Sequence, residues 1–274
     1  MISFSLIFLI TVSLSGVYLI FIWKWRKNRQ SFYCNDKPFL FAHRGSPCCI
    51  TENTILSFKT AIEQGADGLE FDIRLTRDNK IIIFHDSDLI RMAERTEKIN
   101  ETTYSKLKEY KLKKTKGQKE TAHIPLLEEV VPLLNEIKAI NIEIKSDALL
   151  KGANILNPLI QFLDLYQIDN KCIVSSFNPL LLWKLKSKRP KTIIGFLYYR
   201  NIICHSWHNL IWIILCRPDN LHIHFDLLDH WIVGWAQRKG LKINSYTIND
   251  KKTFEKAKKN NIDGVFTDNM EYIK

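Results

Sequence analysis

Two acidic residues separated by a single position could bind a metal ion. Glu70 and Asp72 lie in an apolar run that is typical of a β-strand, and alternate residues of a strand point to the same face of the sheet. A histidine and an arginine, His43 and Arg44, follow a short apolar run further upstream. Carboxylate oxygens beside imidazole and guanidinium groups indicate a site for a divalent metal ion and a phosphate group.

A further acidic strand and a further histidine add to this chemistry. Glu143 and Lys145 lie in another apolar run, and His85 follows a run of isoleucines. Imidazole transfers protons near neutral pH, so His43 and His85 are candidates for a general acid and a general base. An isolated pair of acids is more often part of the solvated surface, and a lone histidine is more often structural. The combination of these groups favours a functional site.

The order of these motifs resembles the glycerophosphodiester phosphodiesterase family. From residue 43 onwards the chain contains HRG, ENT, GAD-x-x-E-x-D, HD and E-x-K, and the resemblance covers residues 38–273. The chain departs from the family pattern at Thr51, Tyr246 and Asn269, where proline, tryptophan and proline are usual. These departures remove no catalytic group, so they bear on pocket shape and substrate choice.

The resemblance implies a role for each motif residue. It implies a divalent cation, Mg²⁺ or Ca²⁺, held by carboxylates, and some members also place the histidine that matches His85 on the metal. It implies one histidine as general acid and one as general base, and which is which stays open. The expected site residues are His43 and His85 for catalysis, Arg44 and Lys145 for the substrate phosphate, Glu70, Asp72 and Glu143 for the metal, and Glu52 and Asn53 in support.

Strand-like and helix-like segments alternate after residue 38. This alternation favours a parallel sheet, and eight strands favour a closed α/β barrel of the TIM (β/α)8 type, which the family resemblance also implies. Residues 87–124 are predicted to be an insertion within a barrel domain over 38–274. Residues 202–216 are either a barrel helix or a lip of the site that enters the membrane interface. Strands are predicted at 39–42, 67–75, 80–84, 140–144, 171–176, 192–197, 241–248 and 264–267.

The N-terminal segment has a different character. Residues 1–23 contain no charged side chain, and about 20 helical residues span the ~30 Å hydrocarbon core of a bilayer. The segment lacks the basic start and the small-residue cleavage site of a signal peptide, so we predict one uncleaved transmembrane helix. Basic residues follow directly in a predicted tether over 24–37. Because positive residues stay on the cytoplasmic side, we predict a single-pass membrane protein with a cytoplasmic catalytic domain.

The net charge of the chain bears on the kind of molecule that it binds. The formal net charge is +11 over 274 residues, which fits either a solvated basic surface or attraction to an anionic partner. No recognisable nucleic-acid-binding module is present, so a lipid or a phosphorylated substrate is favoured, and no obligate protein partner is expected. The six cysteines lack the CxxC spacing of a zinc site and are predicted to be reduced thiols.

The predicted function is metal-dependent hydrolysis of glycerophosphodiesters or lysophospholipids. One histidine would take a proton from the attacking hydroxyl, and the other would protonate the leaving alcohol. The apolar N-terminus resembles the family branch with one N-terminal crossing, which acts as a lysophospholipase D and yields lysophosphatidic acid. Hydrolysis of water-soluble diesters would yield glycerol 3-phosphate instead. An alternative is a non-catalytic barrel that binds phospholipid headgroups.

Overall fold

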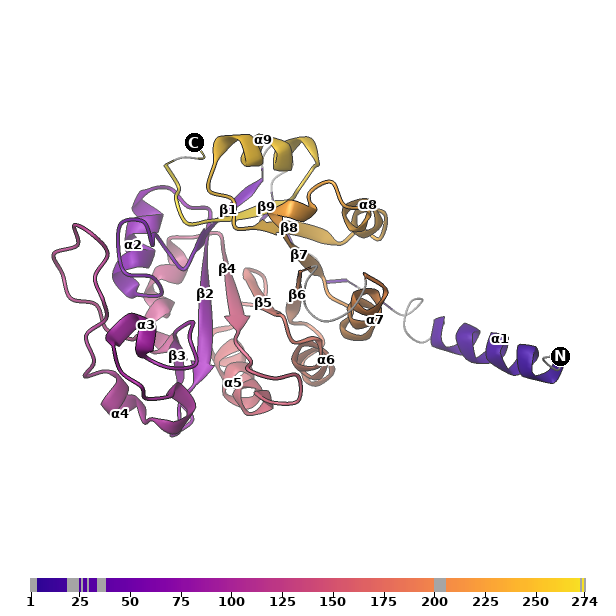
Figure 1. Cartoon of the computed structure of the whole chain (residues 1–274), viewed down its shortest axis with the longest axis horizontal. Helices are drawn as coiled ribbons and strands as arrows, with labels where there is room; N and C mark the ends of the chain where they lie inside the picture. The colour runs from indigo at the N-terminus through magenta and orange to yellow at the C-terminus, as the bar shows by residue number, and fades with distance from the viewer. Residues whose placement is uncertain are drawn as a thin grey trace.

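The computed structural model describes residues 4–18, 25, 27–28, 30–33, 38–199, 206–271 and 273. Parallel strands form a closed barrel in which the last strand pairs with the first, with helices around the outside (Figure 1). The predicted α/β barrel of the TIM type is therefore confirmed. The barrel strands, in order around the barrel, are β1 (Phe39–His43), β2 (Gly68–Leu75), β4 (Ala139–Ile144), β5 (Cys172–Ser176), β6 (Ile193–Tyr198), β7 (Asn220–His224), β8 (Lys242–Tyr246) and β9 (Gly264–Thr267).

Several of the outer helices begin at residues whose side chains cap them. The Thr54 side chain accepts a hydrogen bond from Ser57 N at the start of α2, and Asn178 and Asp250 play the same role further along the chain. Such caps satisfy backbone N–H groups that have no partner within the helix. The outer helices are α2 (Ile55–Glu63), η3 (Leu127–Asn135), η4 (Ala153–Ile155), α5 (Leu156–Tyr166), α6 (Pro179–Lys188), α7 (Ser206–Cys216), η5 (Phe225–Leu227), α8 (Trp231–Arg238) and α9 (Lys251–Lys259).

One predicted barrel strand needs correction, and one barrel strand was not predicted. The segment predicted at 80–84 forms β3 (Ile81–Ile83), which pairs antiparallel with β2 and is not a barrel strand. The barrel instead includes β7, for which no strand was predicted. Asn220 and His222 of β7 are fully buried, because the inner face of the barrel is polar at this level. The alternation of polar and apolar residues there does not mark a solvated face.

The inside of the barrel changes in character from one end to the other. At the N-terminal ends of the strands, the rings of Phe41 and Phe266 lie 5.0 Å apart within an apolar cluster, which we call the barrel floor. Buried polar side chains lie above it, where Asn141 Nδ2 donates to Ser175 Oγ. The C-terminal ends, which we call the mouth, carry the charged residues. The floor consists of Phe39, Phe41, Ile173, Ile193 and Phe266.

Residues 87–124 form their own small core beside the barrel. This segment contains α3 (Ile90–Ala93), η2 (Ile99–Glu101) and α4 (Tyr104–Leu107). Its apolar side chains pack with those of β3 into a cluster that is separate from the barrel core. In the described part of the 202–216 segment, α7 covers the barrel next to α6 (Figure 1), and its Ile213 belongs to the barrel core. This agrees with the barrel-helix alternative.

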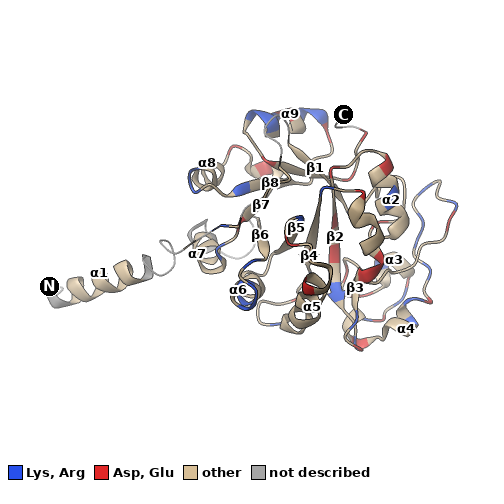
Figure 2. Cartoon of the chain, turned by 180° about the vertical axis from the view of Figure 1, so that it is seen from behind, with Lys and Arg blue, Asp and Glu red and all other residues tan. Residues whose placement is uncertain are grey.

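The apolar N-terminal segment forms a helix, α1 (Phe4–Tyr18), which carries no acidic or basic side chain (Figure 2). Among the described residues, no helix combines the length and the apolar character needed to cross a membrane. The rest of the predicted crossing, residues 1–3 and 19–23, lies outside the described residues, as do several positions of the predicted tether. The described tether residues pack near the barrel floor, where Asn28 N donates to Asp219 Oδ1 at 2.7 Å.

Candidate active site

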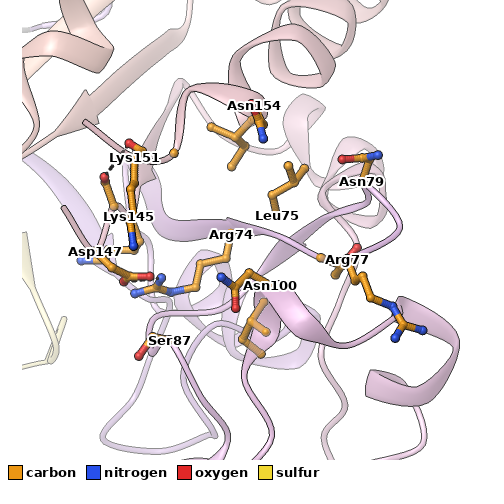
Figure 3. A pocket seen from close by; sticks show the side chains of 15 residues that line it. Arg74, Leu75, Arg77, Asn79, Ser87, Asn100, Lys145, Asp147, Lys151 and Asn154 are labelled. Carbon is orange, nitrogen blue, oxygen red and sulfur yellow. Dashed lines mark hydrogen bonds and ion pairs between the residues drawn. The ribbon is translucent and has the colours of Figure 1, made fainter. Parts of the chain in front are cut away.

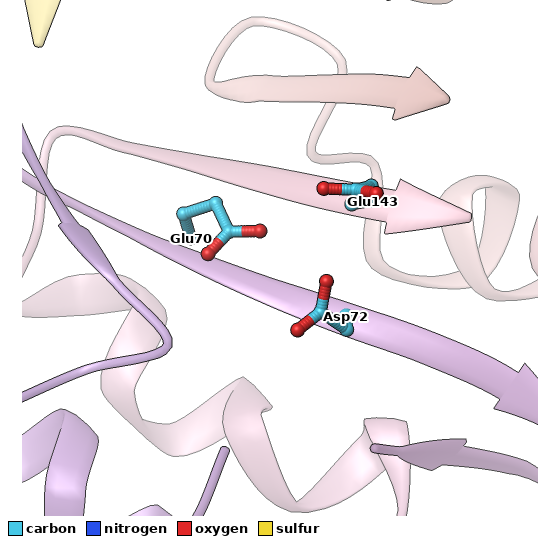
Figure 4. A group of neighbouring side chains, drawn as sticks. All are labelled: Glu70, Asp72 and Glu143. Atoms are coloured by element: carbon cyan, nitrogen blue, oxygen red, sulfur yellow. The ribbon is translucent and has the colours of Figure 1, made fainter. Parts of the chain in front are cut away.

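Three carboxylates from two neighbouring strands meet at the mouth of the barrel (Figure 4). Glu70 and Asp72 point inwards from β2 because they are two residues apart. The parallel register places Asp72 opposite Glu143 of β4. One oxygen from each of the three side chains lies within 4.8 Å of the other two. The structure therefore brings the three predicted metal ligands together.

The electrostatics of this trio fit a bound cation. All three side chains are buried, and burial together with the nearby Asp72 raises the pKa of Glu70 to about 8. Burial also raises the pKa of Glu143, whereas the cations of Lys145 and Arg44 outweigh burial and hold the pKa of Asp72 below its usual range. Glu70 Oε1 has no hydrogen-bond partner within the described part of the chain. Clustered carboxylate oxygens are the ligands that Mg²⁺ and Ca²⁺ prefer.

His43 lies beside this trio at the end of β1. The register of β1 and β2 sets it opposite Glu70, whose Oε2 is 4.0 Å from His43 Nε2. His43 Nδ1 donates to Asp268 Oδ1 at 2.7 Å, because an ionised carboxylate can only accept. Burial lowers the pKa of His43, but the charge of Glu70 and the Asp268 hydrogen bond outweigh it, so the pKa is raised overall. The same hydrogen bond fixes the tautomer and turns Nε2 towards the trio.

His85 is held in a matching way on the other side of the cavity. Its Nδ1 donates to Asp86 Oδ1 at 2.6 Å. Arg91 Nε in turn donates to Asp86 Oδ2, and its Nη2 donates to Glu52 Oε1. Burial lowers the pKa of His85, and the cations Lys145 and Arg44 lower it further, against the raising effect of Asp72. Both histidines therefore present Nε2 as the reactive nitrogen.

The two cations predicted to bind phosphate lie against the carboxylates. Lys145 Nζ is 3.0 Å from Asp72 Oδ1 and also pairs with Glu143. Arg44 Nε lies 3.2 Å from Asp72 Oδ2, and its Nη1 donates to Glu52 Oε1 at 3.0 Å. Both cations are mostly buried, so their charges are weakly screened and strengthen the attraction for an anion.

The loop that carries Arg44 is held in an unusual backbone shape. Arg44 and Asn53 both have positive φ, at 56° and 57°, a region that non-glycine residues seldom adopt. Asn53 Nδ2 donates to Asp72 Oδ2 at 2.8 Å, and Asp72 N donates back to Asn53 Oδ1 at 3.2 Å. Arg44 N donates to Glu70 Oε2 at 2.9 Å. The loop therefore orients two of the three carboxylates.

Several of these groups line one cavity of about 180 Å³. Both histidines, both phosphate-binding candidates, Glu70 and Glu143 line it. Phe177 and Tyr246 form an apolar wall, with their rings in edge-to-face contact. Buried Asn141 and His222 form its base. The cavity can therefore bind an anion beside the carboxylate trio and expose it to two imidazole groups.

Four residues of the site had no role assigned from the sequence. Asp86 and Asp268 orient the two histidines, Arg91 links Asp86 to Glu52, and Asn249 Nδ2 donates to Asp268 Oδ2 at 2.7 Å. The signals for the aspartates were present, since Asp86 is adjacent to His85 and Asp268 directly follows the last predicted strand. No sequence signal marks Arg91, because it lies in the insertion.

Comparison with known proteins agrees with this geometry. A sequence profile of the glycerophosphoryl diester phosphodiesterase family matches residues 43–272. The chain belongs to this family of phosphoric diester hydrolases. It is 32% identical over 240 residues to a glycerophosphodiester phosphodiesterase of Caldanaerobacter subterraneus subsp. tengcongensis, with 86% of this chain and 96% of that protein covered. The predictions of this family and of this enzyme class are thereby confirmed.

Solved structures of other glycerophosphodiester phosphodiesterases have the same fold. The chain resembles an Oleispira antarctica phosphodiesterase in complex with the product sn-glycerol-3-phosphate, with a TM-score of 0.75 and 26% identity, covering 86% of this chain and 95% of that one. It resembles the Thermotoga maritima glycerophosphodiester phosphodiesterase with a TM-score of 0.69 and 31% identity, covering 85% and 96% of the two chains.

Proposed function

We propose that the protein hydrolyses glycerophosphodiesters, including lysophospholipids, to a phosphomonoester and an alcohol in a metal-dependent reaction. One observation carries the proposal. Two histidines, each oriented by an aspartate, line the same cavity as two cations and two of three clustered carboxylates. The solved structure of the Oleispira antarctica phosphodiesterase in complex with the product sn-glycerol-3-phosphate supports this choice of substrate.

The residues divide the chemistry between them. Arg44 and Lys145 would bind the phosphate and offset its negative charge. Glu70, Asp72 and Glu143 would hold a divalent cation, which polarises phosphate oxygens when bound. One histidine would accept a proton at Nε2 from the attacking hydroxyl of water or of the substrate's glycerol, and the other would donate a proton to the leaving oxygen. Attack by the glycerol hydroxyl would release the alcohol and leave a cyclic phosphodiester, which water would then open to the phosphomonoester. Asp86 and Asp268 would keep both rings in the productive tautomer.

The proposal includes a membrane anchor at the N-terminus. Residues 1–23 lack charge, and apolar side chains of α1 such as Phe8 and Leu14 are 69% and 64% exposed. An apolar surface of this kind is stable when lipid covers it. The basic residues that follow favour a cytoplasmic catalytic domain. The described tether residues contact the end of the barrel opposite the mouth. We therefore propose that a lysophospholipid reaches the site after it leaves the bilayer.

The test is a substrate panel with purified protein after EDTA treatment. Glycerophosphoglycerol and lysophosphatidylglycerol are assayed side by side, with Mg²⁺ or Ca²⁺ added back. We expect no turnover in EDTA and restored hydrolysis on metal addition. Hydrolysis of the first diester alone would remove the lysophospholipid part of the proposal. Turnover of neither diester with either metal would overturn the proposed function.

The control variant is His43→Ala. It removes the proton-transfer group and leaves the carboxylate trio in place, so we expect turnover to fall by ~10²–10⁴-fold. Unchanged hydrolysis in this variant would show that the cavity is not the site of reaction.

A further inference from the structure

A second cavity of about 320 Å³ has Lys145 among the residues that line it (Figure 3). Lys145 lines both cavities. The second cavity lies between the turn that follows β2, the η2 turn of the insertion, and the loop that connects β4 to α5. A substrate whose phosphate contacts Lys145 could therefore extend from one cavity into the other.

The charge of the second cavity is positive. Four basic residues line it, and Asp147 is the one acidic residue among the described residues that do so. Arg74 Nη1 donates to Asp147 at 2.8 Å, and Lys145 pairs with the metal-site carboxylates. Arg77 and Lys151 are exposed and form no ion pair within the described part of the chain. Two of the four basic residues that line this cavity thus have no ion-pair partner within the described part of the chain.

Hydrogen bonds connect residues that line this cavity to the predicted catalytic residues or to the loop beside them. Arg74 Nε donates to the carbonyl of His85 at 2.8 Å, so the arginine braces the backbone of a predicted catalytic histidine. Ser146 Oγ donates to the carbonyl of Lys151 at 3.1 Å, which holds the loop beside Lys145. Side chains with neutral donors, among them Asn100 and Asn154, also line the cavity. Such a surface is suited to a charged group with several acceptor oxygens.

We propose that the second cavity is an anion subsite for the alcohol half of the diester, so that the preferred substrates carry a phosphate or another anionic group on that alcohol. This rests on the proposed function, because it assigns the scissile phosphate to the site beside Lys145. An anionic headgroup would be attracted by Arg77 and Lys151, whereas a cationic headgroup such as choline would be repelled. A neutral headgroup would gain neither effect.

The test compares three substrates and two charge-reversal variants. The substrates are glycerophosphoinositol 4-phosphate, glycerophosphoglycerol and glycerophosphocholine, with an anionic, a neutral and a cationic headgroup. The variant Arg77→Glu/Lys151→Glu reverses the subsite. The matched control Lys111→Glu/Lys116→Glu makes the same change in net charge at exposed residues of the insertion that line neither cavity.

We expect kcat/KM of the native protein to decrease from the anionic to the neutral to the cationic diester. In the Arg77→Glu/Lys151→Glu variant it should fall about tenfold for the anionic diester, roughly 1.4 kcal/mol, and stay within about twofold for the neutral one. The control should keep the native ranking. An unchanged ratio of anionic to neutral turnover in the subsite variant, or an equal loss in the control, would overturn the proposal.

A binding measurement separates failure of the subsite from failure of the proposed function. Inositol 4-phosphate is titrated calorimetrically into metal-free protein. The native protein, the subsite variant and the control variant share the same catalytic site, so a difference in affinity between them reports on the second cavity. We expect the native protein and the control variant to bind it, and the Arg77→Glu/Lys151→Glu variant to bind it at least about fivefold more weakly. Equal affinities would overturn the subsite even if no diester were hydrolysed.

Discussion

The floor and the mouth of the barrel are built by the same strands, yet they differ in almost every side chain that faces inwards. On β1, Phe41 belongs to the floor and His43, two residues later, belongs to the site. On β4, Ala139 belongs to the same apolar cluster as the floor, and Glu143 to the carboxylate trio. The two-residue period keeps all these side chains inside the barrel. Residues only two to four positions apart on one strand therefore belong to an apolar cluster and to a buried charged site.

The difference between the two ends indicates what each contributes. The floor buries aromatic rings, which stabilises the fold. The mouth buries three carboxylates against each other, which costs stability unless a cation compensates them. Substitutions at the floor should therefore reduce stability, and substitutions at the mouth should reduce activity.

The largest effect should follow from a change at the mouth. Glu70→Gln keeps the shape of the side chain and an acceptor for Arg44 N, but it removes a metal-binding charge. We expect kcat to fall by about 10³-fold, because loss of a metal ion's charge stabilisation costs several kcal/mol. The free energy of unfolding of the metal-free protein should not decrease. A steady-state assay measures kcat, and a urea titration measures the free energy of unfolding. A loss of stability with retained activity would contradict the assignment of activity to the mouth and of stability to the floor.

The converse substitution is Phe41→Ala at the floor. Phe41 is fully buried, and truncation of a buried phenylalanine costs about 3–5 kcal/mol. The kcat of the folded fraction should stay within about threefold of the native value, since the side chain does not line the cavity. Phe41→Leu serves as the milder control. A stable variant with a large loss of kcat would place the floor within the catalytic machinery.

The sequence predicted much of the mouth but not how its parts meet. Alternation along a strand predicted that Glu70 and Asp72 share a face, whereas the register that sets Asp72 opposite Glu143 depends on strand pairing. The apolar run of β3 resembles a barrel strand because composition does not reveal whether a strand is parallel or antiparallel. The contact between Asn53 and Asp72 depends on a positive φ at Asn53. Asparagine adopts this region more often than most residues, but this preference does not reveal the tertiary contact. No strand was predicted for β7, because the side chains on its buried inner face are polar.

A smaller effect concerns the thermal stability that the protein gains when a metal ion binds at the mouth. A cation that binds the folded state alone stabilises it, by about 2.7 kcal/mol at 100 times the Kd. Thermal unfolding of EDTA-treated protein should therefore shift upwards by several degrees when Mg²⁺ or Ca²⁺ is added. Phe41→Ala should keep this shift and Glu70→Gln should lose it. A shift of the same size in both variants would mean that the ion binds elsewhere.

The smallest predicted effect concerns His222, which lies between floor and mouth. Burial lowers the pKa of His222 to about 3, whereas an unfolded histidine titrates near ~6.5. The unfolded state therefore takes up a proton first, and stability is lost as the pH falls from about 6.5 towards 3. In His222→Gln, the fall in unfolding free energy between pH 6 and 4 should be shallower by about 1 kcal/mol per pH unit. An unchanged slope in urea titrations would contradict the assignment of His222 as a buried neutral group.

The central claim is that the carboxylate trio at the mouth holds one divalent cation. The most direct test is an equilibrium titration of metal-free protein with Mg²⁺ and with Ca²⁺, on the native chain and on Glu70→Gln. We predict one ion bound per native chain and loss of this binding in the variant. Equal binding by the two proteins, or no binding by either, would contradict the account.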